Sequence, residues 1–266
     1  MWNITLEAKE KFRKCNLMPI YESDEEWEMS LREAEEEGED LIARLKEDLE
    51  EVKEELLEVL PDSLKPYVEN GTLVQPDLPK NVRDEYLQWV NDANAEFEEI
   101  LNAAYENTEQ AIKYLPQSVQ DVFAESLHDS MIEKIWREEN TLHLYLNNEG
   151  GFSTKSLVHL IFHGIDAGEE IGTIETGQYF IYSELQKTNG GFAFRVLFDC
   201  PETEWTITAK SIDACYYYRP AAYTRLVEEE MLESTTLAEY LKIINPDFHY
   251  WLITPDAICP IKSLSK

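Results

Sequence analysis

A change in hydrophobic periodicity across Ser126–Phe152 constrains the fold of this chain more than any other feature. Before this stretch, apolar residues recur every three or four positions, which predicts amphipathic α-helices. Within it, the segment Thr141–Asn147 alternates, and places Leu142, Leu144 and Leu146 on one face, which predicts a β-strand. A helical part followed by a strand-rich part indicates an α+β fold.

The part before this change predicts an acidic helical hairpin or bundle over residues 1–127. Thr5 is suited to cap a first helix. A long apolar stripe then runs from Trp27 to Leu60, and Gly38 either kinks this helix or divides it into two. Further helices are expected at 82–104, 108–115 and 117–127. Helices of this length must bury their stripes against one another or against the β part.

The part after the change predicts an antiparallel β domain over residues 128–266. The last of the helices should end near Leu127 or His128, and a hairpin should turn at Glu138–Asn140. A second hairpin turn is expected at Asn189–Gly191, because Gly and Asn accept positive φ. Strands are expected at 131–136, 141–148, 157–163, 179–186, 192–199, 203–209 and 214–218.

Short connections between these strands favour an antiparallel meander, or half a barrel. Beyond Pro220, two apolar patterns predict C-terminal helices that cover one face of the sheet. The predicted organisation is therefore an acidic helical domain (1–127) and an antiparallel β domain with C-terminal helices and a tail (128–266).

Charge is the most unusual property of the composition. The chain has 54 Asp and Glu against 23 Lys and Arg, a formal net charge of −31. Residues 1–127 hold 33 acidic and 12 basic residues, a net charge of −21. Such a field repels nucleic acid phosphates and anionic membranes, and it attracts basic proteins. We therefore expect no nucleic-acid or membrane partner, and the sequence predicts no particular oligomeric state.

The polar side of the 24–60 stripe is the predicted partner-binding surface. One interpretation is a solvated face that keeps the protein soluble, and the other is a docking surface for a basic protein. The second predicts an interaction or inhibitor protein of the immunity or DNA-mimic type. The residues that would carry it are Glu35, Glu36, Glu37, Glu39, Asp40, Glu47, Asp48, Glu51, Glu54 and Glu55.

Cysteine usage and hydropathy predict a cytoplasmic protein. No apolar run approaches the ~18 residues of a membrane span, and the first residues lack the basic-then-apolar order of a signal peptide. The cysteines are scattered without a C-x-x-C pair, which argues against a zinc cluster and a disulfide framework. They are Cys15, Cys200, Cys215 and Cys259.

No pattern predicts a catalytic site or a bound cofactor, which favours a function other than catalysis. Nucleotide-binding glycine loops, metalloprotease motifs and nucleophile elbows are absent from the sequence. His128, Asp129 and Ser130 are adjacent, but sequence neighbours rarely converge as a catalytic triad. We expect Asp129 or Ser130 to hydrogen-bond the backbone at the helix-to-strand junction.

The histidines predict no metal site. His159 and His163 lie on one predicted strand, where two same-face residues four apart are roughly 13 Å apart and cannot share a metal ion. His143 and His249 are isolated in the sequence.

The alternative function is that of a small-molecule-binding domain or enzyme, with a pocket between the sheet and the covering helices. Arg195 is a cation on an otherwise apolar strand, so it should pair with Glu184 or with an anion. The residues expected to line this pocket are His143, Tyr182, Glu184, Arg195 and Trp205.

Four segments carry a resemblance to a known family: SLHDSMIEKI, NTLHLYLNNEGGFSTKSLVHLIF, YFIYSELQKTNGGFAFRVLFDC and EWTITAKSIDACYYYRP. With the N-terminal WNITLEAKEKF, they make the chain similar to a family from Bacillus-type bacteria, domain of unknown function 4085. The resemblance extends over most of the chain. Its motifs are turns and strand cores, so it implies a fold and no catalytic residue, substrate or cofactor.

Overall fold

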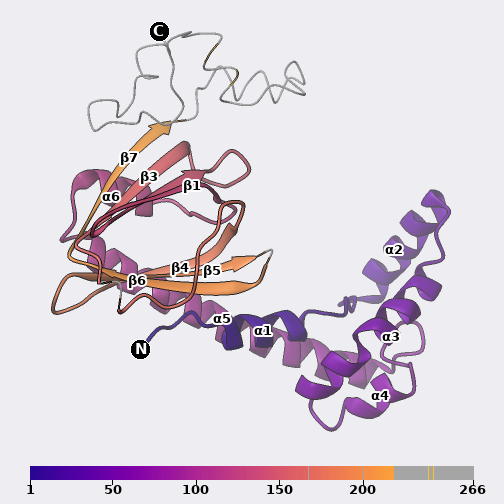
Figure 1. Ribbon diagram of the computed structural model, residues 1–266. Helices are drawn as coiled ribbons and strands as arrows, with labels where there is room; N and C mark the ends of the chain where they lie inside the picture. The colour runs from indigo at the N-terminus through magenta and orange to yellow at the C-terminus, as the bar shows by residue number, and fades with distance from the viewer. Residues whose placement is uncertain (167, 200, 219–238, 240–241, 243–266) are drawn as a thin grey trace. The chain divides into compact units, whose positions relative to one another are not determined.

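The computed structural model describes residues 1–166, 168–199 and 201–218, together with residues 239 and 242 (Figure 1). The chain forms two compact units: a helical unit, Thr5–Leu101, and a β unit, made of Met1–Ile4 and the residues from Asn102 onward. The division falls within α5 (Lys80–Ile112), whereas the periodicity suggested a boundary between residues 127 and 128. The two helices expected after Pro220 lie outside the described residues.

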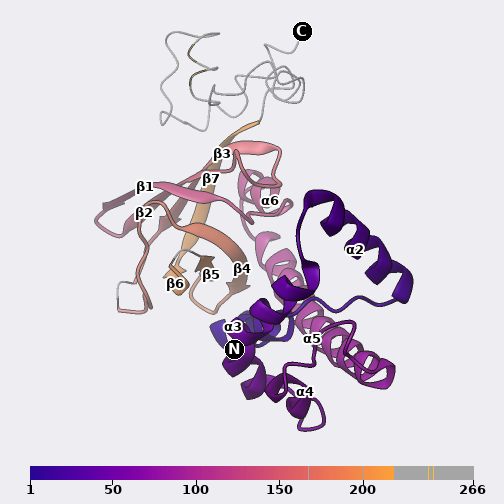
Figure 2. The same ribbon diagram turned by 90° about the vertical axis from the view of Figure 1, so that its right-hand side faces the viewer.

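The helical unit contains four helices and the first part of α5 (Figure 2). Its first three helices are each capped by a side-chain oxygen that accepts a hydrogen bond from a backbone N–H three residues ahead, which confirms the Thr5 cap. The helices are α1 (Leu6–Cys15), α2 (Asp24–Glu37), α3 (Leu41–Val59) and α4 (Lys65–Glu69).

Gly38 divides the long apolar stripe into two helices, the second of the two alternatives. It ends α2 with a backbone φ of 78°, a left-handed conformation that residues with a side chain rarely adopt. The backbone N–H of Glu39 then donates to the carbonyl oxygen of Ala34 at 2.8 Å. Asp40 starts α3 immediately afterwards, so the two halves of the stripe belong to separate helices.

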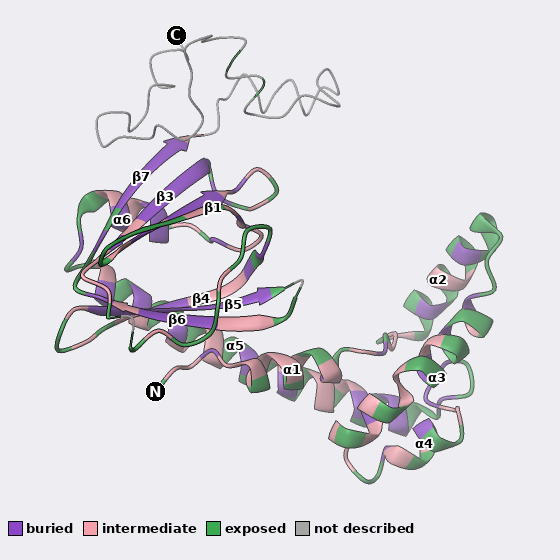
Figure 3. Ribbon diagram, in the orientation of Figure 1, coloured by how far each residue is buried: buried purple, intermediate pink, exposed green. Residues whose placement is uncertain are grey.

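One face of α2 and α3 packs into the core of the helical unit, and exposed stretches alternate with buried ones along both helices (Figure 3). Leu49 and Leu56 are almost inaccessible to solvent. The predicted stripe is therefore the buried side, and its acidic opposite side faces solvent. The other buried members of this core include Trp27, Ala34, Leu41, Leu45, Val68, Leu73, Val74, Val82 and Tyr86.

Helix α5 is longer than predicted. The segment 108–115 was expected to form a separate helix, but it continues α5 to Ile112. No proline or glycine interrupts residues 80–112, so nothing in the backbone ends the helix earlier. Pro116 separates it from α6 (Gln117–Phe123).

The β unit contains a seven-stranded sheet with the order β6-β5-β4-β1-β2-β3-β7, in which all neighbours are antiparallel. The predicted strands are confirmed within a few residues. They are β1 (Met131–Glu138), β2 (Thr141–Asn147), β3 (Lys155–His163), β4 (Tyr179–Lys187), β5 (Phe192–Asp199), β6 (Thr203–Ala209) and β7 (Ser211–Tyr218).

The sheet curls into two facing layers (Figure 1). β1 pairs with β4 only at Met131 and Tyr179, so β4, β5 and β6 form one layer and β1, β2, β3 and β7 form the other. β6 and β7 are the two outermost strands of the sheet, although only Lys210 separates them in the sequence. The backbone N–H of Lys210 donates to the carbonyl oxygen of His163. The strand order differs from a simple meander, because β4 lies beside β1 and β7 lies beside β3.

The core of the β unit fills the space between these layers. Trp205, Phe162 and Phe194 are buried there and their rings contact one another edge-on or stacked. The end of α5, α6 and the connection between them contribute further apolar side chains to this core: Ala111, Leu115, Val119, Val122 and Phe123.

The helix-to-strand junction uses backbone groups more than side chains. α6 ends at Phe123, four residues before the expected Leu127. Asp129 has a φ of 63°, its N–H donates to the carbonyl of Phe180 at 2.8 Å, and the Phe180 N–H donates to the carbonyl of Ser130 at 2.9 Å. The hydroxyl of Ser130 is buried without a partner. The expected hairpin turn after β1 is confirmed, with Glu139 at φ of 48°.

Candidate functional site

The predicted partner-binding surface lies on α2, α3 and the linker between them. We call these ten residues the acidic face, and eight of them are exposed, whereas Asp48 and Glu55 are half-buried. Its members are Glu35, Glu36, Glu37, Glu39, Asp40, Glu47, Asp48, Glu51, Glu54 and Glu55.

Three members of the acidic face have a partner within the helical unit. Glu39 forms an ion pair with Arg44, Glu55 forms one with Arg13, and the Asp40 carboxylate accepts a hydrogen bond from the N–H of Ala43 at 3.0 Å. The other seven make no ion pair with any residue that the structure describes. Most of the acidic face is therefore available to a cation from outside.

Glu35, Glu36 and Glu37 occupy the last turn of α2, which contains no basic residue. The free carbonyl groups at a helix C-terminus carry partial negative charge, so each carboxylate there destabilises the helix by about 0.3–1 kcal/mol. The chain thus concentrates negative charge at a place where helix stability alone would favour lysine or arginine.

The residues expected to line a pocket fall into three places. Glu184 and Arg195 are direct cross-strand neighbours on β4 and β5, and Tyr182 lies two residues before Glu184. Trp205 is buried in the core, where its indole N–H donates to Glu170 at 2.8 Å. His143 is on β2, in the other layer.

Arg195 pairs with a residue other than Glu184. Its guanidinium forms an ion pair with Glu204 and donates to the hydroxyl of Thr206 at 3.3 Å. The same group lies 5.9 Å from the centre of the Trp2 ring. Arg195 therefore binds β6 and the first residues of the chain to β5.

Glu184 is a fully buried carboxylate that accepts five hydrogen bonds and forms no ion pair with a described residue. Two come from the backbone N–H groups of Asn3 and Ile4, at 2.8 and 3.2 Å. Three come from side-chain amides, those of Asn3, Asn107 and Gln186, at 3.0, 2.8 and 2.6 Å. The carboxylate thus joins Met1–Ile4, α5 and β4.

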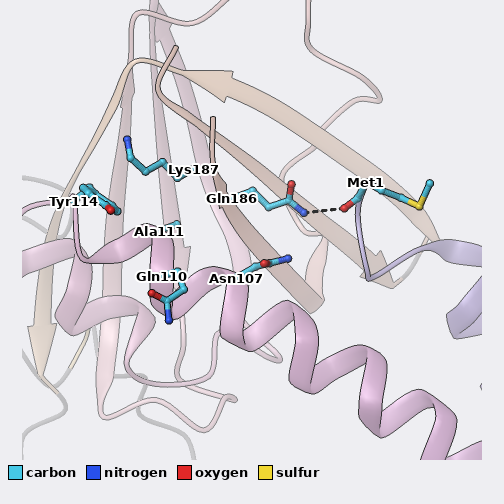
Figure 4. Close-up of a pocket in the computed structure, with 7 residues that line it drawn as sticks. All are labelled: Met1, Asn107, Gln110, Ala111, Tyr114, Gln186 and Lys187. Carbon is cyan, nitrogen blue, oxygen red and sulfur yellow. Dashed lines mark hydrogen bonds between the residues drawn. The ribbon is translucent and has the colours of Figure 1, made fainter. Parts of the chain in front are cut away.

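Asn107 and Gln186, two of the residues that bind this carboxylate, also line a cavity of about 440 Å³ (Figure 4). The end of α5 and the end of β4 supply most of its wall, and Met1 completes it. Figure 4 shows the Gln186 amide reaching the carbonyl of Met1, a hydrogen bond of 3.1 Å. The lining residues are Met1, Asn107, Gln110, Ala111, Tyr114, Gln186 and Lys187.

Two histidines with no apparent connection in the sequence are hydrogen-bonded to each other. Nδ1 of His143 and Nε2 of His159 are 2.9 Å apart on β2 and β3, between the rings of Trp136 and Tyr145. His163 lies further along β3 and contacts Asp213 at 3.0 Å. The register of β2 on β3 brings His143 and His159 together. Because side chains alternate between the two faces of a strand, the sequence pattern could have indicated that these two histidines share a face.

Acid is expected to destabilise the β unit through His159. Burial, followed by the charges of His143 and Lys134, lowers the pKa of His159 from 6.5 to about 4. The unfolded chain takes up this proton first, so stability is complete above pH 6.5 and falls as the pH drops towards 4, by roughly 3 kcal/mol. In urea unfolding across this range, His159→Phe should lose this part of the pH dependence and keep its stacking on Tyr145. An unchanged pH profile would contradict the assignment.

Metal ligands are not gathered into a site in the part of the chain that the structure describes: it contains no group of three or more His, Cys, Asp or Glu placed to hold an ion. Cys15 and Cys215 are buried free thiols. Among the same residues, no helix has the length and apolar character needed to cross a membrane.

Comparison with known proteins identifies one family. Residues 6–209 match the model of a family described as "Protein of unknown function (DUF4085)". This match covers α1 to β6. No curated protein and no solved structure matches the chain.

Proposed function

The chain belongs to the DUF4085 family of proteins of unknown function, and we propose that it is an interaction protein that binds a basic protein through its acidic face. The acidic face would attract such a partner over distances of about 10 Å at 0.1 M salt and hold it by charge-assisted contacts. An inhibitor of a basic enzyme, of the immunity or DNA-mimic type, has this chemistry.

The observation that carries this proposal is the position of Glu35, Glu36 and Glu37. A solvated face only needs charges that keep the protein soluble, and these can stand anywhere along a helix. Carboxylates in the last turn of α2 interact unfavourably with the helix dipole, so they lower the stability of the helix. No basic residue in that turn offsets this loss. Their field adds to that of the exposed carbonyl groups, which makes this end of α2 the natural contact for a cation.

Neutralising these three carboxylates is expected to weaken partner binding by roughly tenfold or more. The partner is captured from lysate at low salt and identified, and its dissociation constant is then measured at several salt concentrations. The variant is Glu35→Gln, Glu36→Gln, Glu37→Gln. Its matched control carries the same charge change on α5: Glu98→Gln, Glu99→Gln, Glu106→Gln. All six side chains are exposed. The dissociation constant of the α2 variant should also depend less on the salt concentration.

The same α2 variant should be more stable than the unchanged protein, by about 1 kcal/mol, because it removes three unfavourable interactions between carboxylates and the helix dipole. Urea unfolding of both variants measures this difference. Equal weakening of binding by the two variants would indicate a general charge effect and contradict a site on α2. Capture of no basic protein at low salt would contradict the proposed function as a whole.

A further inference from the structure

The first four residues of the chain bind to the β unit as a short peptide binds to a receptor. They belong to the β unit, whereas the helical unit starts immediately after them. Gln186 donates a hydrogen bond from its amide to the carbonyl of Met1 at 3.1 Å. The backbone N–H groups of Asn3 and Ile4 donate to the Glu184 carboxylate. The segment is therefore held through its backbone at three of its four residues.

Three side chains of this segment have contacts that depend on their identity. The Asn3 amide donates to the Glu184 carboxylate at 3.0 Å. The centre of the Trp2 ring lies 5.9 Å from the guanidinium of Arg195. Ile4 is 1% exposed, so its side chain is buried. A carboxylate suits an amide donor, a guanidinium suits an aromatic ring, and a buried position suits an apolar side chain. The site thus favours the sequence pattern aromatic–Asn–aliphatic.

Glu184 requires an occupant that supplies hydrogen-bond donors. It is fully buried and forms no ion pair with a described residue, and three of its five donors come from Asn3 and Ile4. Without them it would keep only the amides of Asn107 and Gln186. A buried carboxylate with too few donors is strongly unfavourable. The surface formed by β4, β5 and α5 therefore favours any peptide that supplies these three donors, whether or not it belongs to the same chain.

The site extends beyond the part that Met1 fills. Met1 forms one part of the wall of the cavity of about 440 Å³, and the ends of α5 and β4 form the rest (Figure 4). Asn107 and Gln186, which bind Glu184, line the same cavity. Its volume is within the usual range for ligand sites. A peptide that continues beyond the position of Met1 has this space to enter, so it can make contacts that Met1–Ile4 does not make.

We propose that this surface of the β unit is a peptide-binding site and that Met1–Ile4 is its built-in ligand. A segment of a partner protein with the pattern aromatic–Asn–aliphatic replaces Met1–Ile4 there, and the residues before its aromatic position enter the cavity. The exchange is favourable because the partner returns the three donors of Glu184 and adds contacts in the cavity. This site does not include the acidic face, so it is independent of the proposed binding of a basic protein.

The probe is the synthetic peptide AAMWNIT, which carries residues 1–5 of the chain after two alanines and a fluorescent dye at its C-terminus. Fluorescence anisotropy measures its dissociation constant. In the full chain, Asn3→Asp places a second carboxylate against Glu184 and should release Met1–Ile4. This variant is expected to bind the peptide roughly tenfold or more tightly than the unchanged protein, whose own segment competes at an effective concentration of about 1 mM.

Two controls carry the same change of amide to carboxylate. Asn94→Asp, in the helical unit, keeps the oxygen that accepts a hydrogen bond from Asn16, and it should bind the peptide as weakly as the unchanged protein does. The peptide AAMWDIT has aspartate in place of asparagine. It should bind to the Asn3→Asp protein roughly tenfold more weakly than AAMWNIT, because its carboxylate meets Glu184.

Two results would overturn the proposal: a folded Asn3→Asp protein that binds no peptide, and equal binding of the two peptides. If Asn3→Asp does not fold, the unchanged protein decides the question. At about 5 mM AAMWNIT, above the effective concentration of the attached segment, the backbone amide signals of Asn3 and Ile4 should move in proton–nitrogen correlation spectra as Met1–Ile4 is displaced. Signals that stay in place would also count against the site.

Discussion

Replacing Glu184 with alanine is expected to destabilise the β unit by about 4 kcal/mol, since each buried donor that loses its acceptor costs about 1–3 kcal/mol. Five donors converge on this carboxylate, from the first residues of the chain, from α5 and from β4. Water can reach some of them after the substitution, so the loss is smaller than the sum. Urea unfolding gives the free energy, and amide hydrogen exchange at Asn3 and Ile4 gives the local effect.

Two further variants separate the carboxylate from its surroundings. Glu184→Gln keeps the shape but turns an NH₂ group towards the donors, so it should fall between alanine and the unchanged protein. Asn107→Ala removes a single donor and should cost only about 1 kcal/mol. If exchange at Ile4 were no faster in Glu184→Ala than in the unchanged protein, the carboxylate would not be what holds Met1–Ile4 to the β unit.

The secondary structure could be predicted from the sequence because its signals are local. The Thr5 cap, the alternation in β2 and the glycine turn before β5 each depend on a few adjacent residues. Gly38 is a position where the local sequence is ambiguous, because it was compatible with either a kink in one helix or a break between two. In the structure, the N–H of Glu39 bonds back to α2, so the helix ends there. The prediction of separate helices at 82–104 and 108–115 is wrong because no proline or glycine ends the helix between them.

The contacts that build the candidate sites could not be predicted, because they join residues far apart in the chain. Glu184 binds Asn3, and the two are 181 positions apart. Arg195 was expected to pair with Glu184, its direct neighbour across the strands, but its long side chain reaches Glu204 on the other side. The residues of the acidic face could be identified from the sequence, because the charged side of an amphipathic helix is recognised from helical spacing alone.

Replacing Glu125 with glutamine is expected to destabilise the β unit by about 3–5 kcal/mol, because it leaves the buried ammonium of Lys155 without a carboxylate. The Lys155 side chain is 3% exposed, and its ammonium is 2.6 Å from Glu125. The ring centres of Tyr216 and Tyr218 lie 5.4 and 5.5 Å from this ammonium, and they supply a weaker attraction. The double variant Glu125→Gln, Lys155→Met removes the buried charge and should recover much of the loss.

Acid should affect the unchanged protein and Glu125→Gln differently. Burial alone would raise the pKa of Glu125, but hydrogen bonds from Lys155, Thr154 and Ser153 prevail and lower it from 4.5 to about 2. The carboxylate therefore stabilises the fold fully above pH 4.5, and this contribution, roughly 3 kcal/mol, is lost as the pH falls towards 2. Glu125→Gln cannot titrate and should lack this decline in urea unfolding between these pH values. A decline of the same size in both proteins would assign the acid sensitivity to other carboxylates and leave the Lys155 pair without the strength inferred from its burial.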